Sequence, residues 1–277
     1  MAALPTDLNG LSIELDDGVA VLLIDNGPIN LIDRQLYGSL RRAIDWAATD
    51  DDVRVVVLRS ANPDYFMAHF DVELILSFPI DSPAERSDTL SAFHLMGEQL
   101  RTMPKPTICE IDGRVGGGGG ELSASCDMRF GTPRTILCQM EVPLGILPGG
   151  AGTQRLPRLI GRGRAMEVVL GGDDIEASTL FAWGWLNRVV AAEELRSWVD
   201  AFAARLAGFP PEAVARAKAS VLAAGDDPVP GLLDEAMLFQ ETLRTDAAQA
   251  RMRAFLERGG QTPEGESRVG ALGNELG

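Results

Sequence analysis

A glycine-rich segment that ends in a glutamate is the part of this sequence that most directly suggests chemistry. It reads Gly113-Arg114-Val115-Gly116-Gly117-Gly118-Gly119-Gly120-Glu121, follows a β-like run and precedes a helix-like stretch that reaches Cys126. Glycines allow close approach of the backbone to a ligand, and a helix start directs free N–H groups and a positive dipole end toward it. The segment predicts an oxyanion or phosphate cradle, with a flexible glycine-rich turn as the alternative.

Several familiar chemical motifs do not occur in the sequence. There is no GxxxxGK[ST], and the glycine segment does not fit GxGxxG because Glu121 and Leu122 stand at its end. A GxSxG nucleophile elbow is also missing. His69 and His94 are the only histidines, so a multi-histidine metal centre is excluded and we expect no metal site.

Composition and charge narrow the class of protein further. The chain has 277 residues, of which 45% are hydrophobic and 23% charged, which is enough for a large core in one main domain. A net charge of −15 would repel nucleic-acid backbones and anionic lipid surfaces, so we expect neither as a partner. No apolar run is long enough to cross a bilayer, and the first seven residues lack the features of a signal peptide. We therefore expect a cytoplasmic protein.

The first two thirds of the chain alternate strand-like and helix-like patterns. Asp16-Asp17-Gly18 predicts a hairpin turn, and apolar residues at helical spacing after Asp33 predict a helix with Asp33 as its N-cap. A second helix should end near Pro104. The expected strands are 12–14, 19–25, 53–58, 107–111, 128–130, 136–139 and 187–190. This alternation predicts an α/β fold with a largely parallel sheet.

The last third of the chain has a different pattern. From residue 192 onward the apolar spacing is only helical, and beyond Arg258 the sequence becomes Gly-rich and weakly hydrophobic. We therefore divide the chain into a catalytic core at 1–191, a helical region at 192–258 and a disordered tail at 259–277.

Five segments, spread over residues 10–258 in one order, resemble the enoyl-CoA hydratase/isomerase (crotonase) family. They are 111–132, which contains the glycine run and Glu121; 141–156, which begins with Glu141 and contains TQRL; 66–72, similar to the FxAGxDL loop; Pro28-Ile29-Asn30-Leu31; and RAFLER at 253–258, similar to the family's AFLEKR. The resemblance implies a crotonase-like spiral of β-β-α units. It also implies that the C-terminal helical region forms a homotrimer or a dimer of trimers.

Carried onto this chain residue by residue, the resemblance implies an active site. The backbone N–H groups of Ala68 and Gly118 would bind the thioester oxygen, while Glu121 binds and activates water and Glu141 acts as the main proton donor. From the residues alone, Glu121 could equally complement the helix dipole and Glu141 could be a solvated loop acid. The resemblance implies substrate contacts at Asn30, Leu31, Ala68, His69, Phe70, Asp71, Val72, Gly117, Gly118, Pro143 and Gly149.

One departure from the family pattern falls beside the expected oxyanion site. His69 stands where the family usually has Gly, and it could narrow the acyl channel, join the proton transfers or simply pack with its hydrogen bonds satisfied. We expect a 2-enoyl-CoA hydratase with no permanently bound cofactor, coenzyme A arriving as part of the substrate. The alternatives are another crotonase-type reaction, such as isomerisation, hydrolysis or carbon–carbon cleavage, and a non-catalytic acyl-CoA-binding subunit.

Overall fold

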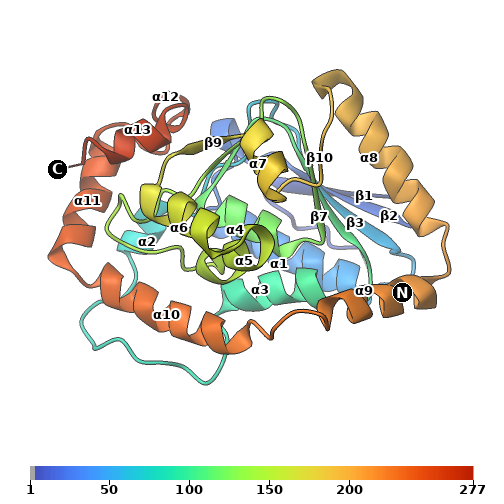
Figure 1. Ribbon diagram of the computed structural model, residues 1–277, viewed down its shortest axis with the longest axis horizontal. Helices are drawn as coiled ribbons and strands as arrows, with labels where there is room; N and C mark the ends of the chain where they lie inside the picture. The colour runs from blue at the N-terminus through green and yellow to red at the C-terminus, as the bar shows by residue number, and fades with distance from the viewer. Residues whose placement is uncertain (1–3, 277) are drawn as a thin grey trace.

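The computed structural model describes residues 4–276, which form two β-sheets with helices packed around them (Figure 1). The larger sheet has the order β1-β2-β3-β5-β7-β10, and the smaller has the order β4-β6-β8-β9. The strands of the larger sheet are β1 Leu11–Asp16, β2 Val19–Ile24, β3 Val55–Ser60, β5 Thr107–Ile111, β7 Met128–Gly131 and β10 Arg188–Val189. Those of the smaller sheet are β4 Tyr65–Met67, β6 Arg114–Gly116, β8 Ile136–Cys138 and β9 Asp174–Glu176. Pairing is parallel except at β1–β2 and β8–β9.

Helices fill most of the remaining chain. The core helices are η1 Gly27–Ile29, α1 Arg34–Thr49, α2 Val72–Leu76, α3 Ala92–Thr102, α4 Gly117–Ser125, α5 Gly152–Ile160, α6 Arg162–Gly171 and α7 Ala177–Trp183. The C-terminal helices are α8 Ala192–Ala207, α9 Pro211–Leu222, α10 Val229–Leu243, α11 Asp246–Glu257, α12 Pro263–Glu266 and α13 Val269–Gly273. Within residues 4–276, no helix has the length and apolar character that a membrane span requires.

Successive pairs of strands repeat one arrangement. In β3–β4, β5–β6 and β7–β8, the first strand joins the larger sheet, the second joins the smaller sheet, and a helix follows. This repeat confirms the predicted α/β spiral of β-β-α units. It also brings the three connections that follow β4, β6 and β8 to the edge of the smaller sheet where these strands end, since the strands are parallel neighbours.

Local signals explain the elements that the sequence predicted well. Asp17 and Gly18 have φ values of 42° and 82°, as expected of a two-residue turn whose twist matches a hairpin, and they join β1 to β2. The Asp33 carboxylate accepts hydrogen bonds from the N–H groups of Gln35 and Leu36, so it caps α1 as expected.

The C-terminal helices pack on the rest of the chain. The apolar face of α8 covers one face of the larger sheet, where Leu195 and Val199 contact Val55, Val57 and Phe130 in one buried cluster. Further along, α10 packs near α5 and α11 packs near α2, as the orange helices in Figure 1 show. The helical region is thus part of the folded core unit and supplies one side of the site described below.

The segment expected to be a disordered tail is folded over its described part, residues 259–276. Its apolar side chains Val269, Leu272 and Leu276 are buried in a cluster with Phe255 of α11 and Val72 of α2. Composition alone predicted disorder because glycines and polar residues dominate the segment. That prediction was wrong because three well-spaced apolar residues suffice when a preformed apolar surface receives them. Residues 1–3 and 277 lie outside the described part of the chain.

Candidate active site

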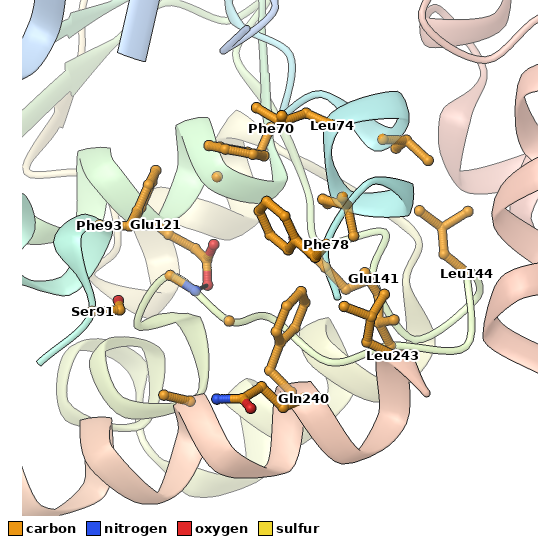
Figure 2. A pocket seen from close by; sticks show the side chains of 18 of the residues that line it. Phe70, Leu74, Phe78, Ser91, Phe93, Glu121, Glu141, Leu144, Gln240 and Leu243 are labelled. Carbon is orange, nitrogen blue, oxygen red and sulfur yellow. Dashed lines mark hydrogen bonds between the residues drawn. The ribbon is translucent and has the colours of Figure 1, made fainter. Parts of the chain in front are cut away.

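A cavity of about 840 Å³ lies between the loops that follow the smaller sheet, α2, the segment 78–93 and α10. Its walls are mainly apolar and aromatic, and Glu121 and Glu141 are both exposed to it. Figure 2 shows the Glu121 carboxyl group directed into this space, with Phe70, Phe78 and Phe93 around it. A mainly apolar pocket with a few polar groups directed into it is typical of a small-molecule site.

The glycine run forms the buried first half of α4, so the alternative of a flexible turn is wrong. Gly116 precedes the helix in an extended conformation, and Gly117 opens it with φ of 39°. A Cβ on Gly117 would lie 2.7 Å from the Cβ of His69 and 2.9 Å from Oε1 of Glu141. Only glycine therefore fits where the helix start, the loop after β4 and the Glu141 loop meet.

The predicted oxyanion donor at Ala68 requires correction. The Ala68 N–H donates to the Ile29 carbonyl at 3.1 Å, which removes it as a free donor. The Phe70 N–H has no acceptor among residues 4–276, although its neighbours are fixed by bonds from Ile32 N to His69 O and from Asp71 N to Ile32 O. The bridge between Ile32 and Phe70 creates this arrangement, and the sequence pattern did not reveal it.

Phe70 and Gly118 form the pair of amides that the site offers to an oxygen. The Gly118 N–H belongs to the first turn of α4, where helix N–H groups lack intrahelical acceptors, and no side chain caps this end. A Cβ on Gly118 would be 3.3 Å from the Phe70 nitrogen, so the two backbones are close neighbours. The predicted role of Gly118 is compatible with this geometry, and Phe70 takes the place of Ala68.

Glu121 is buried and is held in place by backbone hydrogen-bond donors. Its Oε1 accepts hydrogen bonds from the N–H groups of Gly150 and Gly152, both at 2.8 Å, and the residue is buried. Burial, followed by the charges of Glu141 and Glu235, raises the pKa of Glu121 well above its ordinary value despite those two bonds. A raised pKa makes the Glu121 carboxylate a stronger base than an ordinary glutamate.

Glu141 lies in the loop after β8 and is also buried. Burial raises the pKa of Glu141 to about 7, against which the neighbouring His69 acts in the opposite direction. Its Oε2 contacts the side-chain amide of Gln139 at 3.3 Å. The prediction of a solvated loop acid is therefore wrong, and this carboxyl is suited to gain and lose a proton near neutrality.

Sequence reasoning missed Glu235, which lies on α10 and is 1% exposed. It accepts hydrogen bonds from the N–H groups of Ala151 and Thr153, at 2.7 and 3.0 Å, and from the Thr153 hydroxyl. Nε2 of His94 lies 3.1 Å from the same carboxylate. Glu235 thereby fixes the loop that holds Glu121. Its only sequence signal is an acid on the apolar side of a helix.

His69 points away from the open cavity and toward the C-terminal segment. Its Nδ1 lies 2.8 Å from the Phe70 carbonyl and its Nε2 lies 3.0 Å from Oε1 of Glu266. With 3% of its surface exposed, it matches the interpretation of a buried histidine whose hydrogen bonds are satisfied. It still contributes to the cavity wall, next to Glu141.

The other predicted contact residues divide into two groups. The cavity is lined by His69, Phe70, Val72, Gly118 and Gly149 together with the two glutamates. Asn30, Leu31, Ala68, Asp71, Gly117 and Pro143 are not part of its wall.

Asn30 and Asp71 instead hold the loops of the site in place. The Asn30 amide donates to the carbonyls of Tyr65 and Phe66, and Asp71 caps α2. Both side chains therefore position the loop that carries Phe70.

Two further observations concern a buried arginine and the possible ligands of a metal ion. Arg155 is buried and forms an ion pair with Glu98 at 2.8 Å. Within the described residues, no cluster of three or more His, Cys, Asp or Glu side chains is arranged to hold a metal ion.

Comparison with known proteins agrees with the resemblance seen in the sequence. The family model described as "Enoyl-CoA hydratase/isomerase" matches residues 14–264. A "Probable enoyl-CoA hydratase" of Bacillus subtilis is 31% identical over 257 residues, covering 91% of this chain and 97% of that protein. A protein of Mycobacterium leprae with the same description is 31% identical over 231 residues, covering 83% and 88% of the two chains.

A solved structure agrees over nearly the whole chain. The crystal structure of a "putative enoyl-CoA hydratase" from Streptomyces avermitilis has a TM-score of 0.88 and 36% identity, with 97% of this chain and 98% of that chain covered. The match extends over both sheets and the C-terminal helices. The chain therefore has a crotonase-like α/β fold and belongs to the enoyl-CoA hydratase/isomerase family.

Proposed function

We propose that this protein is an enoyl-CoA hydratase, which adds water across the 2,3 double bond of an enoyl-CoA thioester. The observation that carries the proposal is the meeting of two buried glutamates and two backbone amides at one apolar cavity. Coenzyme A arrives as part of the substrate, and the reaction needs no permanently bound cofactor.

The amides of Phe70 and Gly118 bind the thioester oxygen in this proposal. As water adds to the β-carbon, negative charge moves onto that oxygen, and donors directed at it stabilise the enolate-like transition state. One such donor in a site with little water is worth about 3 kcal/mol. Because both donors belong to the backbone of packed elements, they need little rearrangement during the reaction.

The two glutamates supply the proton transfers. Glu121 binds the attacking water and accepts a proton as the new carbon–oxygen bond forms, and Glu141 donates a proton to the α-carbon. The sum of the two transfers is the addition of one water molecule to the substrate, and return of a proton from Glu121 to Glu141 through solvent restores both carboxyl groups. A pKa of about 7 for Glu141 suits a group that must give up a proton in one step and regain one in the next.

A panel of enoyl-CoA thioesters tests the proposal directly. Purified protein is mixed with short, long, branched and cyclic 2-enoyl-CoA substrates while the absorbance of the conjugated double bond is followed. We expect loss of that absorbance and formation of the 3-hydroxyacyl product. A protein that binds these thioesters without consuming any of them would instead support a non-catalytic binding subunit.

Double-bond isomerisation is the second candidate, because a single carboxyl such as Glu141 could move a proton between two carbons on the same oxyanion hole. Incubation with 3-enoyl-CoA distinguishes the two reactions. An isomerase produces conjugated absorbance from that substrate and adds no water to the product.

We further propose that the chain assembles as a homotrimer or a dimer of trimers. In support, α9 buries none of its residues within its own chain, and Val221 on that helix is 75% exposed. Amphipathic helices without an apolar neighbour commonly pack against other subunits. Light scattering at several concentrations measures the mass, and a monomer at every concentration would contradict this proposal.

A further inference from the structure

A buried ion pair joins the loop after β4 to the C-terminal segment, 197 residues later in the chain. Nε2 of His69 lies 3.0 Å from Oε1 of Glu266, and the two side chains are 4% and 3% exposed. The Gln261 N–H donates to the same carboxylate oxygen at 2.8 Å. At the position of His69 the family pattern has glycine, which could not make this pair.

The contacts of His69 determine its charge. Each ring nitrogen faces an oxygen that can accept a hydrogen bond, Nδ1 facing the Phe70 carbonyl and Nε2 facing Glu266. A neutral imidazole carries one N–H and can satisfy only one of these acceptors, whereas an imidazolium satisfies both. Burial by itself would lower the pKa of His69, but Glu266 and the Phe70 carbonyl outweigh burial and raise it. The pKa of Glu266 is lowered because His69 outweighs the opposite effect of burial.

His69 also lies close to Glu141, one of the two carboxyl groups assigned to proton transfer. The Cβ of His69 and Oε1 of Glu141 both fall within 3 Å of the point where a Cβ on Gly117 would lie, at 2.7 and 2.9 Å. The side chains of His69 and Glu141 are therefore near neighbours. A positive charge there favours the carboxylate form of Glu141, whereas burial favours the protonated form.

Other charged groups surround this arrangement and must be considered. Arg114 on β6 acts on Glu266 while it is itself paired with Asp174 on β9 at 2.6 Å. The Tyr65 hydroxyl on β4 donates to the Pro263 carbonyl beside the pair. Neither Arg114 nor Tyr65 is among the groups that act on Glu141.

The groups facing Glu141 are one cation and two acids. His69 supplies the positive charge, Glu235 on α10 supplies a negative charge, and Glu121 on α4 is coupled to Glu141 within the cavity. Together with a backbone hydrogen bond at Glu141, the charge of His69 therefore opposes the accumulation of protons on Glu141.

We propose that His69 and Glu266 are positioning residues of this active site. Their ion pair docks residues 259–276 against the loop that carries the Phe70 amide, and it holds a positive charge beside Glu141. The kinetic part of this proposal rests on the proposed hydratase function, whereas the charge of His69 and the docking of the segment do not.

Histidine NMR tests the charge without any activity measurement. The chain contains two histidines, so ¹³C labelling of the imidazole Cε1 gives two signals, which the His69→Gln variant assigns. We expect the His69 signal to stay in the protonated position at pH values above its ordinary pKa of about 6.5. In Glu266→Gln, the titration should fall to or below that ordinary value. Glu264→Gln removes an exposed acid from the same short helix and should change nothing.

Kinetics and hydrogen exchange test the consequences of the pair. In His69→Gln and Glu266→Gln, the limb of the kcat profile that depends on the glutamates should move to higher pH by about 1 unit, because a carboxylate loses a nearby cation. Amides in residues 263–273 should exchange at least tenfold faster in both variants than in wild type or Glu264→Gln.

The outcomes separate the two proposals. A neutral His69 at pH 6.5 in the wild type, or equal effects of Glu264→Gln and Glu266→Gln, would overturn the positioning role even in an active hydratase. Absence of hydration with a protonated His69 and a docked segment would overturn the proposed reaction and leave the docking by the ion pair established.

Discussion

The carboxylates of Glu121 and Glu235 bind alternate amides of the same loop. Glu121 accepts from the N–H groups of Gly150 and Gly152, while Glu235 accepts from those of Ala151 and Thr153. The loop is the start of α5, so both acids also lie near the positive end of a helix dipole. A side chain on the C-terminal helix α10 thereby helps to hold a candidate catalytic carboxyl on α4.

Replacing Glu235 with Gln should therefore impair catalysis more than binding. We expect kcat to fall at least tenfold with KM changed by less than threefold, because the loop loses an anchor while the cavity wall is kept. Removal of a like charge also lowers the pKa of both Glu121 and Glu141, so the pH profile should move toward lower pH. Glu241→Gln, an exposed acid on the same helix, is the matched control. An unchanged pH profile in Glu235→Gln would contradict this role.

Both glutamates should be needed if water is added. Glu121→Gln and Glu141→Gln should each lower hydration by about a hundredfold to ten-thousandfold, the usual contribution of a general acid or base. Binding of a saturated acyl-CoA, measured by calorimetry, should persist because the oxyanion donors and the apolar walls are intact. Full hydration activity in either variant would contradict the proposed hydratase function. Loss of activity in only one variant would favour isomerisation.

The close approach of Gly118 to Phe70 can be tested with one added methyl group. A Cβ on residue 118 would lie 3.3 Å from the Phe70 nitrogen, so Gly118→Ala should crowd the space that the thioester oxygen needs. We expect kcat/KM to fall at least tenfold while the melting temperature changes little, since up to about 3 kcal/mol of transition-state stabilisation depends on each donor. Gly163→Ala on α6, where nothing lies within 4 Å of the new Cβ, controls for the substitution itself. Equal activity of the two variants would argue against an oxyanion hole at this position.

Local signals were enough to predict much of the larger sheet. The hairpin depends on two residues with positive φ, and α1 depends on its Asp33 cap and apolar spacing, so a few neighbouring residues determine each element. Of the smaller sheet only β8 was predicted, because strands of three residues are too short for a clear period-two pattern.

The residues of the candidate site could be predicted from the sequence only in part. Glu121 and Glu141 could be identified from their motifs, but the choice of amide donor depended on a bridge between Ile32 and Phe70 that no local pattern reveals. Glu235 and Glu266 bind partners more than 80 residues away, and in the sequence they are ordinary acids on helical or Gly-rich segments. Contacts of this range are consequences of topology, and residue type alone does not predict them.

The raised pKa of Glu141 makes a final prediction about stability. An unfolded glutamate has a pKa near 4.5, and burial brings the folded value to about 7, so the folded state binds a proton more tightly than the unfolded state. Folding therefore loses stability as the pH rises from about 4.5 to about 7, and the loss stays constant above that range. By linkage the loss reaches a few kcal/mol, because each pH unit between the unfolded and folded pKa values contributes on the order of 1.4 kcal/mol.

Glu141→Gln, which cannot ionise, should raise the melting temperature by several degrees at pH 8 and hardly change it at pH 5. Glu167→Gln on the exposed face of α6 should have no such pH-dependent effect. Thermal unfolding of the three proteins at both pH values measures the difference, and equal shifts at pH 5 and pH 8 would show that Glu141 is ionised without cost in the folded protein.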